Sequence, residues 1–510
     1  MKHHSRFYTH TTLLIVVSLL CAPLVTPSFF ASRTNSAGQF AINLDCSTDN
    51  GTIVPYAELN SGPLPIHYVK GNDITGQYKE VGIDFIRTHD FYGPTDISTI
   101  FPDWNADPEK EESYNFTSSD YYITGIVNAG CCIFYRLGES ASDNETLRQP
   151  PQNFSKWAEI CKHVVMHYND GWDSGYNYNI TYWEIWNEPD LDGFWNGTAE
   201  QYYELYKAAV QILKEYNESL KIGGPCTSSV GNANYTTGFL DYITENELPL
   251  DFFSWHMYAD SPDELYMASR TVRKMLDDYG LADCENINTE WNINILSPQR
   301  DNDNAKNAAF TACVLTAFQD AGIDHAFRYR GTQDNNLLMK LLGFDLSIFA
   351  YDGTYKTPAL TYLAMHYLVR DGPIRLSTPP MNTSDGISYL AGISGDKTNV
   401  SVLISNYDAP DVSYTLNIAN LPWNECTAVY YLIDDSHHLE ITENETLSSS
   451  NCSITTTIES NTVQFIRLTN STSLPDEGPE VASIPFLLRI SLLDPFFRIM
   501  GLILLSMVFG

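Results

Sequence analysis

Two glutamates stand where a pair of carboxyl groups is able to do chemistry. Glu188 lies in the stretch YWEIWNEPDLDGFW, residues 182–195, and Glu290 lies in the stretch INTEWN, residues 287–292. Each comes at the end of a short apolar run of the kind found in buried β-strands. Cleavage of a glycosidic bond needs two such groups, because one protonates the leaving oxygen while the other attacks or screens the oxocarbenium-like centre. Glu188 and Glu290 are therefore a candidate catalytic pair.

The residue after Glu188 is Pro189. A proline disfavours the α region for the residue before it, so we expect an extended backbone at Glu188 that holds its carboxylate in one place. A glutamate at a strand end also has ordinary uses, as a cap for the next helix or as the partner of an arginine. The motif alone leaves both interpretations open.

Short apolar runs alternate with helical patterns from about residue 50 to residue 370. The runs expected to be strands are residues 84–88, 131–136, 180–186, 221–224, 252–257, 287–290 and 325–329, with a first strand near 52–56. Stretches with apolar residues at helical spacing lie between them, at residues 154–168, 199–216, 262–279 and 306–321. Repeated β-then-α units indicate parallel strands, and about eight of them predict an α/β fold, a closed (β/α)8 TIM barrel.

A barrel of this kind would bring the two glutamates together. Enzymes with this fold carry their chemistry at the C-terminal ends of the strands. Glu188 follows the fourth expected strand and Glu290 ends the seventh, so both should face one mouth. A retaining glycosidase needs its two carboxyl groups about 5–5.5 Å apart, which this geometry permits.

We expect the barrel to occupy residues 33–372, because the texture of the sequence changes after it. Residues 373–470 contain no long amphipathic pattern, are dense in Thr, Ser and Asn, and show period-2 runs at 400–404, 428–432 and 462–468. This pattern predicts a C-terminal antiparallel β-sandwich domain. Residues 471–483 form a polar linker that contains prolines.

The two ends of the chain are apolar. Lys2 and Arg6 precede an apolar run at residues 13–24, which is typical of a signal segment, and we assign residues 1–32 to it. Residues 484–510 form a hydrophobic C-terminal tail interrupted by charges and prolines. Its uninterrupted part is too short to cross a bilayer as a helix, so the alternatives are membrane association, the removed tail of a lipid-anchor signal, or packing on the protein.

Composition favours a secreted or extracellular-surface protein. The formal net charge is −34 and the pI is about 4.5, which makes nucleic acid an unsuitable partner. Thirteen Asn-X-Ser/Thr acceptors indicate a glycoprotein: Asn50, Asn115, Asn144, Asn153, Asn179, Asn196, Asn217, Asn234, Asn382, Asn399, Asn444, Asn451 and Asn470.

Metal-binding patterns are weak in this sequence. The chain has ten cysteines without a CxxC pair, and Cys426 and Cys452 could form a disulfide in an oxidising compartment. His163 and His167 have the spacing of a metal pair, but no glutamate completes a zincin motif, so we interpret them as structural. We expect no metal and no cofactor.

The motifs together resemble glycoside hydrolase family 39, the β-xylosidases and α-L-iduronidases of the retaining (β/α)8 clan. WEIWNEPDLDGFW is similar to the acid/base signature, and INTEWN to the strand that carries the nucleophile. Further similar segments occur in family order: GIDFIRTHD at 82–90, KIGGP at 221–225, DFFSWHMY at 251–258 and GFDLSIFAYDGTYKTPALTYLAMHYL at 343–368. The resemblance covers about residues 50–370.

The resemblance implies a role for each matching residue. Glu188 would be the general acid/base and Glu290 the nucleophile. Asn187 would bond the sugar 2-hydroxyl. The remaining candidates would line the sugar subsite: His89, His256 and Tyr258 around it, and Trp291 as a wall or stacking surface.

One segment departs from the family pattern. After the eighth expected strand the chain reads YRGTQD, so Arg330 stands where xylosidases tend to carry an aromatic sugar platform. A guanidinium there could pair with the carboxylate of an acidic sugar. A salt bridge from Arg330 to Asp334 is the structural alternative.

These observations predict a retaining exo-glycoside hydrolase that acts on an oligo- or polysaccharide, with β-xylosidase-like specificity as the first choice. A uronidase acting on acidic sugars is the nearest alternative, and transglycosylation by the same residues stays open. The rival from another class is a catalytically silent carbohydrate-binding protein at the cell surface. The oligomeric state is left open.

Overall fold

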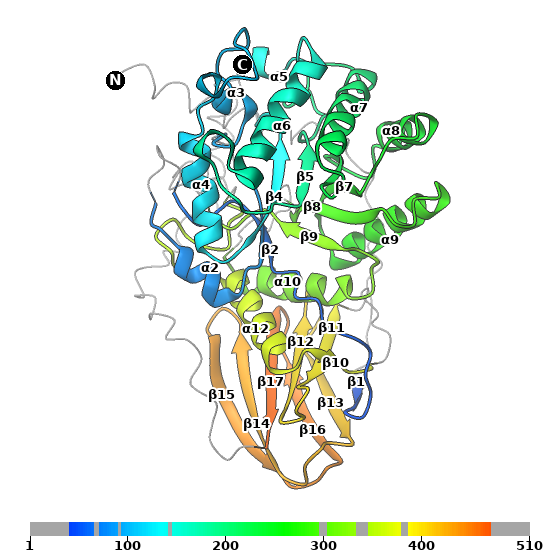
Figure 1. Cartoon of the computed structure of the whole chain (residues 1–510). Helices are drawn as coiled ribbons and strands as arrows, with labels where there is room; N and C mark the ends of the chain where they lie inside the picture. The colour runs from blue at the N-terminus through cyan, green and yellow to red at the C-terminus, as the bar shows by residue number, and fades with distance from the viewer. Residues whose placement is uncertain are drawn as a thin grey trace, which may run out of the picture.

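A computed structural model describes residues 40–65, 71–89, 93–140, 145–294, 303–332, 345–378 and 386–470. Eight parallel strands form a closed barrel in the chain order β2 to β9, as predicted, and Figure 1 shows this barrel above a second, all-β part. The barrel strands are β2 (Glu58–Asn60), β3 (Phe85–Arg87), β4 (Cys132–Leu137), β5 (Tyr182–Ile185), β6 (Lys221–Thr227), β7 (Phe252–Ala259), β8 (Glu285–Ile293) and β9 (His325–Arg328).

Helices surround the barrel and connect its strands (Figure 1). They are α2 (Thr75–Val81), α3 (Ile97–Ile100), η1 (Glu111–Ser113), α4 (Thr117–Asn128), α5 (Glu145–Arg148), α6 (Phe154–Asp170), η2 (Trp172–Ser174), α7 (Ala199–Tyr216), α8 (Ala233–Glu245), α9 (Pro262–Asp278), α10 (Ala305–Phe318) and α12 (Thr357–Asp371). The helix that follows the acid/base motif is well delimited, because Thr198 and Gln201 form a reciprocal capping box at the start of α7. The four helices expected from spacing correspond to α6, α7, α9 and α10.

The prediction of a first strand near residues 52–56 is wrong. Thr52 makes only an isolated antiparallel bridge to Ile374, and the barrel strand β2 begins later, at Glu58. The strand is difficult to recognise because its inward residues are polar rather than apolar. Glu58 bonds the backbone of Ala326, and Asn60 donates to the Thr289 carbonyl at 2.9 Å.

The second part of the protein is a two-layer β-sandwich. A six-stranded sheet has the order β10 (Ile374–Arg375), β11 (Ile387–Ile393), β12 (Asn399–Asn406), β17 (Thr462–Thr469), β14 (Cys426–Ile433) and β15 (His438–Leu447). Aliphatic and tyrosine side chains of both sheets pack between the layers. Cys426 and Cys452, a possible disulfide pair in the sequence, are unbonded here.

The second layer shows that the boundary expected at residue 33 is misplaced. It has the order β1 (Phe40–Asp45), β13 (Val412–Ala419) and β16 (Cys452–Ile458), and β1 pairs with β13 in parallel. Ile42 and Leu44 point into the sandwich core. The first described strand, β1, therefore belongs to the C-terminal sandwich domain. Its apolar side chains are buried there against the other strands of the sandwich.

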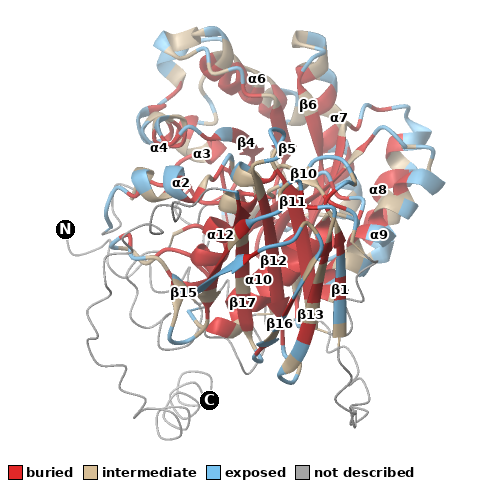
Figure 2. Cartoon of the chain, turned by 90° about the horizontal axis from the view of Figure 1, so that it is seen from below, coloured by how far each residue is buried: buried red, intermediate tan, exposed pale blue. Residues whose placement is uncertain are grey.

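The six-stranded sheet is covered on both faces. One face meets the three-stranded layer, while the other packs on α10 and α12, so β12 and β17 are drawn largely as buried in Figure 2. Polar contacts also join the sheet to the barrel. Ser405 donates to the Ala309 carbonyl at 3.0 Å, and Arg375 forms a bidentate ion pair with Asp320. The barrel and the sandwich are joined through these helices.

The expected signal segment, linker and hydrophobic tail lie outside the described residues. Within the described ranges, no helix combines the length and the apolar character needed to cross a membrane.

Candidate active site

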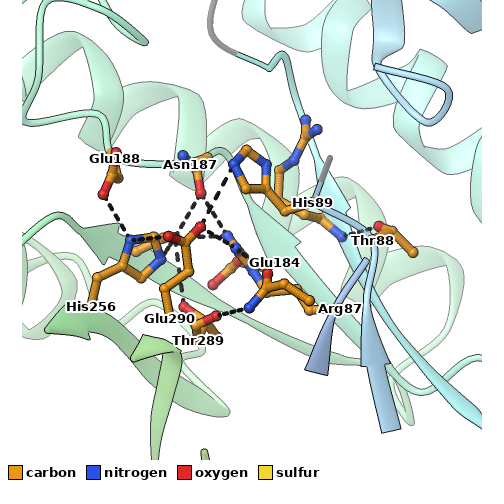
Figure 3. Close-up of polar contacts among 12 residues, drawn as sticks. Arg87, Thr88, His89, Glu184, Asn187, Glu188, His256, Thr289 and Glu290 are labelled. Atoms are coloured by element: carbon orange, nitrogen blue, oxygen red, sulfur yellow. Dashed lines mark hydrogen bonds and ion pairs between the residues drawn. The ribbon is translucent and has the colours of Figure 1, made fainter. Parts of the chain in front are cut away.

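The two candidate glutamates meet at one place in the barrel mouth. Glu188 follows β5, Glu290 lies in β8, and their side chains are almost fully buried, with 4% and 5% of each residue exposed. One carboxylate oxygen of each and a ring nitrogen of His256 all lie within 4.8 Å of one another. Figure 3 shows His256 joined by dashed lines to both glutamates.

The backbone of Glu188 is not extended, contrary to the expectation from Pro189. Its φ is 43°, and Trp186 nearby has a φ of 73°. Hydrogen bonds on both sides hold this turn: the Glu188 amide donates to the Cys226 carbonyl at 2.9 Å, and Leu191 donates to the Glu188 carbonyl at 3.0 Å. A positive φ in a residue other than glycine costs about 1–3 kcal/mol and is found most often at functional sites.

The carboxylate of Glu290 is surrounded by groups that favour its charge. Tyr258 donates its hydroxyl proton to Oε2 at 2.8 Å, and Arg87 donates from Nη1 to Oε1 at 3.0 Å. His89 Nε2 lies 3.6 Å from Oε1. Burial raises the pKa of Glu290, while His256, the guanidinium of Arg87 and the hydroxyl of Tyr258 oppose that rise.

Glu188 is placed differently. Its Oε1 lies 2.9 Å from His256 Nδ1, and no cation contacts it among the described residues. Burial, followed by the charge of Asp190, raises the pKa of Glu188 to about 8. Asp190 is itself fixed by hydrogen bonds from Ser228 and Asn232. Glu188 therefore holds a proton near neutral pH, whereas Glu290 has a cation beside it.

Arg87 links the site together, although its role was not predicted. It is fully buried in β3, where it donates to Glu184 at 2.8 Å and to Asn187 Oδ1 at 2.7 Å, as well as to Glu290. The ion pair with Glu184, in β5, balances its charge in the barrel interior. The sequence did contain a signal for this ion pair, because each residue is a charged residue within an otherwise apolar strand. Arg87 lies in FIR and Glu184 lies in YWEIW.

The two predicted histidines lie at the site and are neutral. Burial lowers the pKa of His256 to about 4, and burial with the charge of Arg87 lowers the pKa of His89 well below its usual range. Within the described part of the chain, His89 Nδ1 and Asn187 Nδ2 have no hydrogen-bond partner. The site thus contains two buried polar atoms without a hydrogen-bond partner.

Aromatic rings that were not predicted stand beside His89. The rings of Phe194 and Tyr329 lie 6.3 and 6.4 Å from its imidazole, and Tyr329 lies 6.5 Å from Tyr258. Tyr329 is the residue before Arg330, so an aromatic ring stands beside His89 one position before the residue at which the motif comparison placed the aromatic platform.

The prediction that Trp291 walls the sugar is wrong. Its side chain is fully buried on the outer side of β8, where its indole donates to the Ala326 carbonyl at 3.0 Å and packs against Phe310 and Phe318 of α10. The reason is a bulge in β8: the strand pairs Trp255 with Asn288 but His256 with Glu290. The extra residue turns Glu290 inward and Trp291 outward.

One family of known proteins matches the sequence of this chain. The sequence model described as glycosyl hydrolases family 39 matches residues 67–355, more than half of the chain and a span that includes both glutamates. The chain belongs to glycosyl hydrolases family 39.

Similar proteins include two β-xylosidases. This family 39 chain is 25% identical over 269 residues to the β-xylosidase of Geobacillus stearothermophilus, which covers 47% of this chain and 52% of that protein. It is 30% identical over 194 residues to the β-xylosidase of Caldicellulosiruptor saccharolyticus, covering 35% and 37%. The matches thus span about half of these relatives or less.

A similar solved structure, a glucosidase from Croceicoccus marinus, has a TM-score of 0.74 at 24% identity. The alignment covers 86% of this chain and all of that one (100%), so the likeness extends over the barrel and the sandwich as a shared fold.

In this family 39 chain, Arg330 is close to the site, but its side chain is buried and held by neighbouring groups. It is 2% exposed, its Nε donates to the Thr332 carbonyl at 2.7 Å, and its guanidinium carbon lies 5.6 Å from the centre of the Tyr329 ring. Its charge is among those that lower the pKa of His89. Asp334, the alternative partner, lies outside the described residues.

Within the residues that the structure describes, two groups of side chains have the donor atoms of a metal site. Glu188, His256 and Glu290 form one, in which the cation of Arg87 already occupies one side of Glu290. The other group, Glu109, Glu159 and His163, lies away from the mouth, near α6. His163 in that group bonds the Glu159 carbonyl and is surrounded by Tyr114 and Trp172, which agrees with its structural interpretation.

Proposed function

We propose that this protein is a retaining exo-glycoside hydrolase with β-xylosidase-like specificity, in which Glu188 is the general acid/base and Glu290 the nucleophile. The observation that carries the proposal is the separation of the two carboxylates, whose nearest oxygens lie within 4.8 Å. Retaining enzymes hold their carboxyl groups about 5–5.5 Å apart, whereas inverting enzymes leave about 6.5–9.5 Å for a water molecule.

In the first step, the ionised Glu290 attacks the anomeric carbon while Glu188 gives its proton to the glycosidic oxygen. The bond to the leaving group breaks, the leaving group departs with that proton, and a covalent glycosyl ester forms on Glu290. The environments support this division of labour, because Glu188 is protonated near neutral pH and Arg87 stabilises the charge of Glu290.

In the second step, Glu188 acts as a base. It takes a proton from a water molecule, whose oxygen attacks the anomeric carbon and releases Glu290 as a carboxylate. Two inversions at the same carbon leave its configuration unchanged. Tyr258 holds the carboxylate of Glu290 at 2.8 Å, ready to receive the charge that returns to it.

Other residues would bind the sugar. Asn187 has its amide oxygen fixed by Arg87, which orients the free Nδ2 as a donor for the 2-hydroxyl. His89 offers a second free polar atom, and His256 and Tyr258 close the subsite from β7. Tyr329 replaces Trp291 as the candidate aromatic wall.

Substrate specificity depends on Arg330. The similarity to two β-xylosidases supports a pentose first, while a guanidinium this close to His89 favours an acidic sugar as the second candidate. A uronide carboxylate would pair with Arg330, and a xyloside has no group that needs it.

We also propose a secreted or surface-bound glycoprotein. Eleven of the glycosylation acceptors lie in the described residues, and nine of these are exposed, while Asn217 and Asn399 are half-buried and none is buried. Treatment of protein from a eukaryotic host with an endoglycosidase should therefore lower its apparent mass.

The decisive experiment compares the wild type with Glu290→Gln and Glu188→Ala on a panel of aryl glycosides, neutral and uronic. Glu290→Gln should lower kcat by at least about 10⁴-fold because the nucleophile is lost. Glu188→Ala should lower kcat/KM by about 10²–10⁴-fold for poor leaving groups, the usual contribution of a general acid. Glu215→Gln, on the exposed side of α7, is the control.

Product stereochemistry and binding separate the alternatives. Proton NMR of the first product should show the substrate's anomeric configuration, and mass spectrometry with a slow 2-fluoro substrate should find the sugar on Glu290. A carbohydrate-binding protein would bind sugar equally well in all variants and turn over none. Turnover confined to uronides would replace the xylosidase assignment by the uronidase one.

A further inference from the structure

Cys226 is a buried thiol at the centre of the site that the two-step mechanism does not use. It lies in β6, is fully buried, and has a φ of 56°. It is the bulged residue of its strand, because Pro225 pairs with Ser254 and Thr227 with the next residue, Trp255. A bulge of this kind re-aims a side chain, here into the barrel mouth.

The sulfur of Cys226 contacts several residues of the site. Its Sγ lies 3.1 Å from Arg87 Nη2 and 3.1 Å from His256 Nε2, with longer contacts to Asn187 Oδ1 at 3.6 Å and Thr289 Oγ1 at 3.7 Å. Its backbone carbonyl also accepts the hydrogen bond from the Glu188 amide. Cys226 thus touches both the backbone of the acid/base and the imidazole that holds its carboxyl group.

The donors and acceptors at these contacts follow from the chemistry of each group and from the distances. A guanidinium only donates, so the sulfur accepts from Arg87. The thiol stays protonated because burial raises its pKa well above the usual range, and it has one S–H to give. Asn187 Oδ1 can accept from the thiol as well as from Arg87, but it lies 3.6 Å from the sulfur, and Thr289 Oγ1 lies 3.7 Å from it. His256 Nε2, at 3.1 Å, is therefore the nearest acceptor for the S–H.

The tautomer of His256 then decides where the proton of Glu188 lies. A neutral imidazole carries one N–H. If Nε2 accepts from the thiol, the N–H is on Nδ1 and donates to Glu188 Oε1, 2.9 Å away. The acidic proton of Glu188 must then sit on Oε2. With the opposite tautomer, Nδ1 would accept a hydrogen bond from the acidic proton of Glu188. That proton would then point at His256 and not at the substrate.

We propose that Cys226 is a positioning residue that sets the tautomer of His256, so that the Nδ1–H faces Glu188 Oε1 and the acidic proton of Glu188 is directed from Oε2 toward the glycosidic oxygen. This inference rests on the proposed function of Glu188. The same Nδ1–H stabilises the carboxylate that Glu188 becomes after it has given up its proton, so one arrangement serves both steps.

The test uses the dependence of rate on the leaving group. Cys226→Ala should lower kcat/KM for alkyl or phenyl glycosides, which need protonation, by about 10–100-fold, the usual cost of losing a partner that orients a functional group. For a dinitrophenyl glycoside, which leaves without help from an acid, kcat/KM should stay within about 2-fold. Cys226→Ser keeps a donor and should restore most of the lost rate.

The matched control is Cys161→Ala, which removes an equally buried thiol on α6, away from the mouth. It should leave the leaving-group dependence unchanged. An equal loss for both substrate types in Cys226→Ala, no loss for either, or no rescue by serine would overturn the proposal. A wild type without glycosidase activity would instead defeat the proposed function itself.

A spectroscopic measurement tests the tautomer without activity. In ¹⁵N-histidine-labelled wild type at pH 7, the signal of His256, assigned among the 12 histidines by its absence in His256→Asn, should show a protonated Nδ1 and an unprotonated Nε2. In Cys226→Ala the same signal should shift toward the other tautomer. A protonated Nε2 in the wild type sinks the proposal, whether or not any Cys226 variant folds.

Discussion

The two glutamates of the mouth are the same amino acid with different neighbours. Glu290 has Arg87 and Tyr258 within 3.0 Å of its oxygens, while Glu188 has a neutral imidazole and the negative charge of Asp190. Burial raises the pKa of both; the charge of Asp190 adds to the rise at Glu188, whereas Arg87 and Tyr258 oppose the rise at Glu290. Two carboxyl groups whose environments move their pKa values apart are the arrangement that acid and nucleophile require.

This separation predicts the alkaline limit of activity. The pKa of Glu188 is about 8, and the group must be protonated to act as an acid, so kcat/KM should fall tenfold per pH unit above pH 8. Because the charge of Asp190 contributes to the high pKa, Asp190→Asn should move the alkaline limb to lower pH. A pH profile of kcat/KM from pH 4 to 10 measures both, and a limb unmoved by Asp190→Asn contradicts this account.

At the scale of elements, strand register decides which side chains face the mouth. Strict alternation from the inward Ile287 would place Trp291 inside and Glu290 outside. The bulge between β7 and β8 reverses this, and Trp291 instead fills the layer between β8 and α10. A shift by one residue exchanges the two faces of a strand, so the bulge is what places the nucleophile in the mouth.

This register gives a contrast between two aromatic substitutions. Trp291→Ala should lower the free energy of unfolding by about 3–5 kcal/mol, the usual cost of deleting a large core side chain, with little change in KM for the folded enzyme. Tyr329→Ala, beside His89, should raise KM and destabilise less. Chemical denaturation measures the unfolding free energies of the two variants, and steady-state kinetics measures their KM. A raised KM with unchanged stability in Trp291→Ala would show that Trp291 contacts the sugar after all.

At the scale of the whole molecule, burial of carboxyl groups accompanies a net charge of −34. Besides the catalytic pair, Glu139 is buried and accepts hydrogen bonds from Ser98. Burial raises the pKa of Glu139, and the negative charge of Asp96 raises it further. In an unfolded chain these groups ionise near their ordinary pKa of about 4.3. The folded protein therefore binds protons more tightly than the unfolded chain over several pH units.

Stability should accordingly fall as pH rises from about 6.5 to 8.5. Glu139 and Glu188 have raised folded pKa values, so their contribution is present at low pH and lost as pH rises through the folded value. Above about pH 6.5 the unfolded histidines are neutral and no longer offset this trend. Urea denaturation across this range measures the slope.

The matched variant for this prediction is Glu139→Gln. It cannot ionise but keeps an amide that is able to bond Ser98, and it should make the fall in stability shallower. Stability that is constant or increases between pH 6.5 and 8.5 would show that these carboxyl groups are not held neutral in the folded protein.

Local patterns in the sequence determined the alternation of strands and helices, and with it the barrel and the rim at which Glu188 and Glu290 stand. Those features depend on neighbouring residues: apolar spacing along each strand and helix, and motifs at strand ends. The resemblance of six segments in order pointed to the family that the later comparison established.

Only the tertiary structure decided features that depend on partners far along the chain. Residues 40–45 join the sandwich because β13, more than 350 residues away, supplies the pairing edge. The bulges that turn Cys226 and Glu290 into the mouth exist only relative to the neighbouring strand, and Arg87 acquires its role from side chains on other strands. A side chain's face and its charged neighbours are set by register and packing across the barrel, which no local pattern of residues encodes.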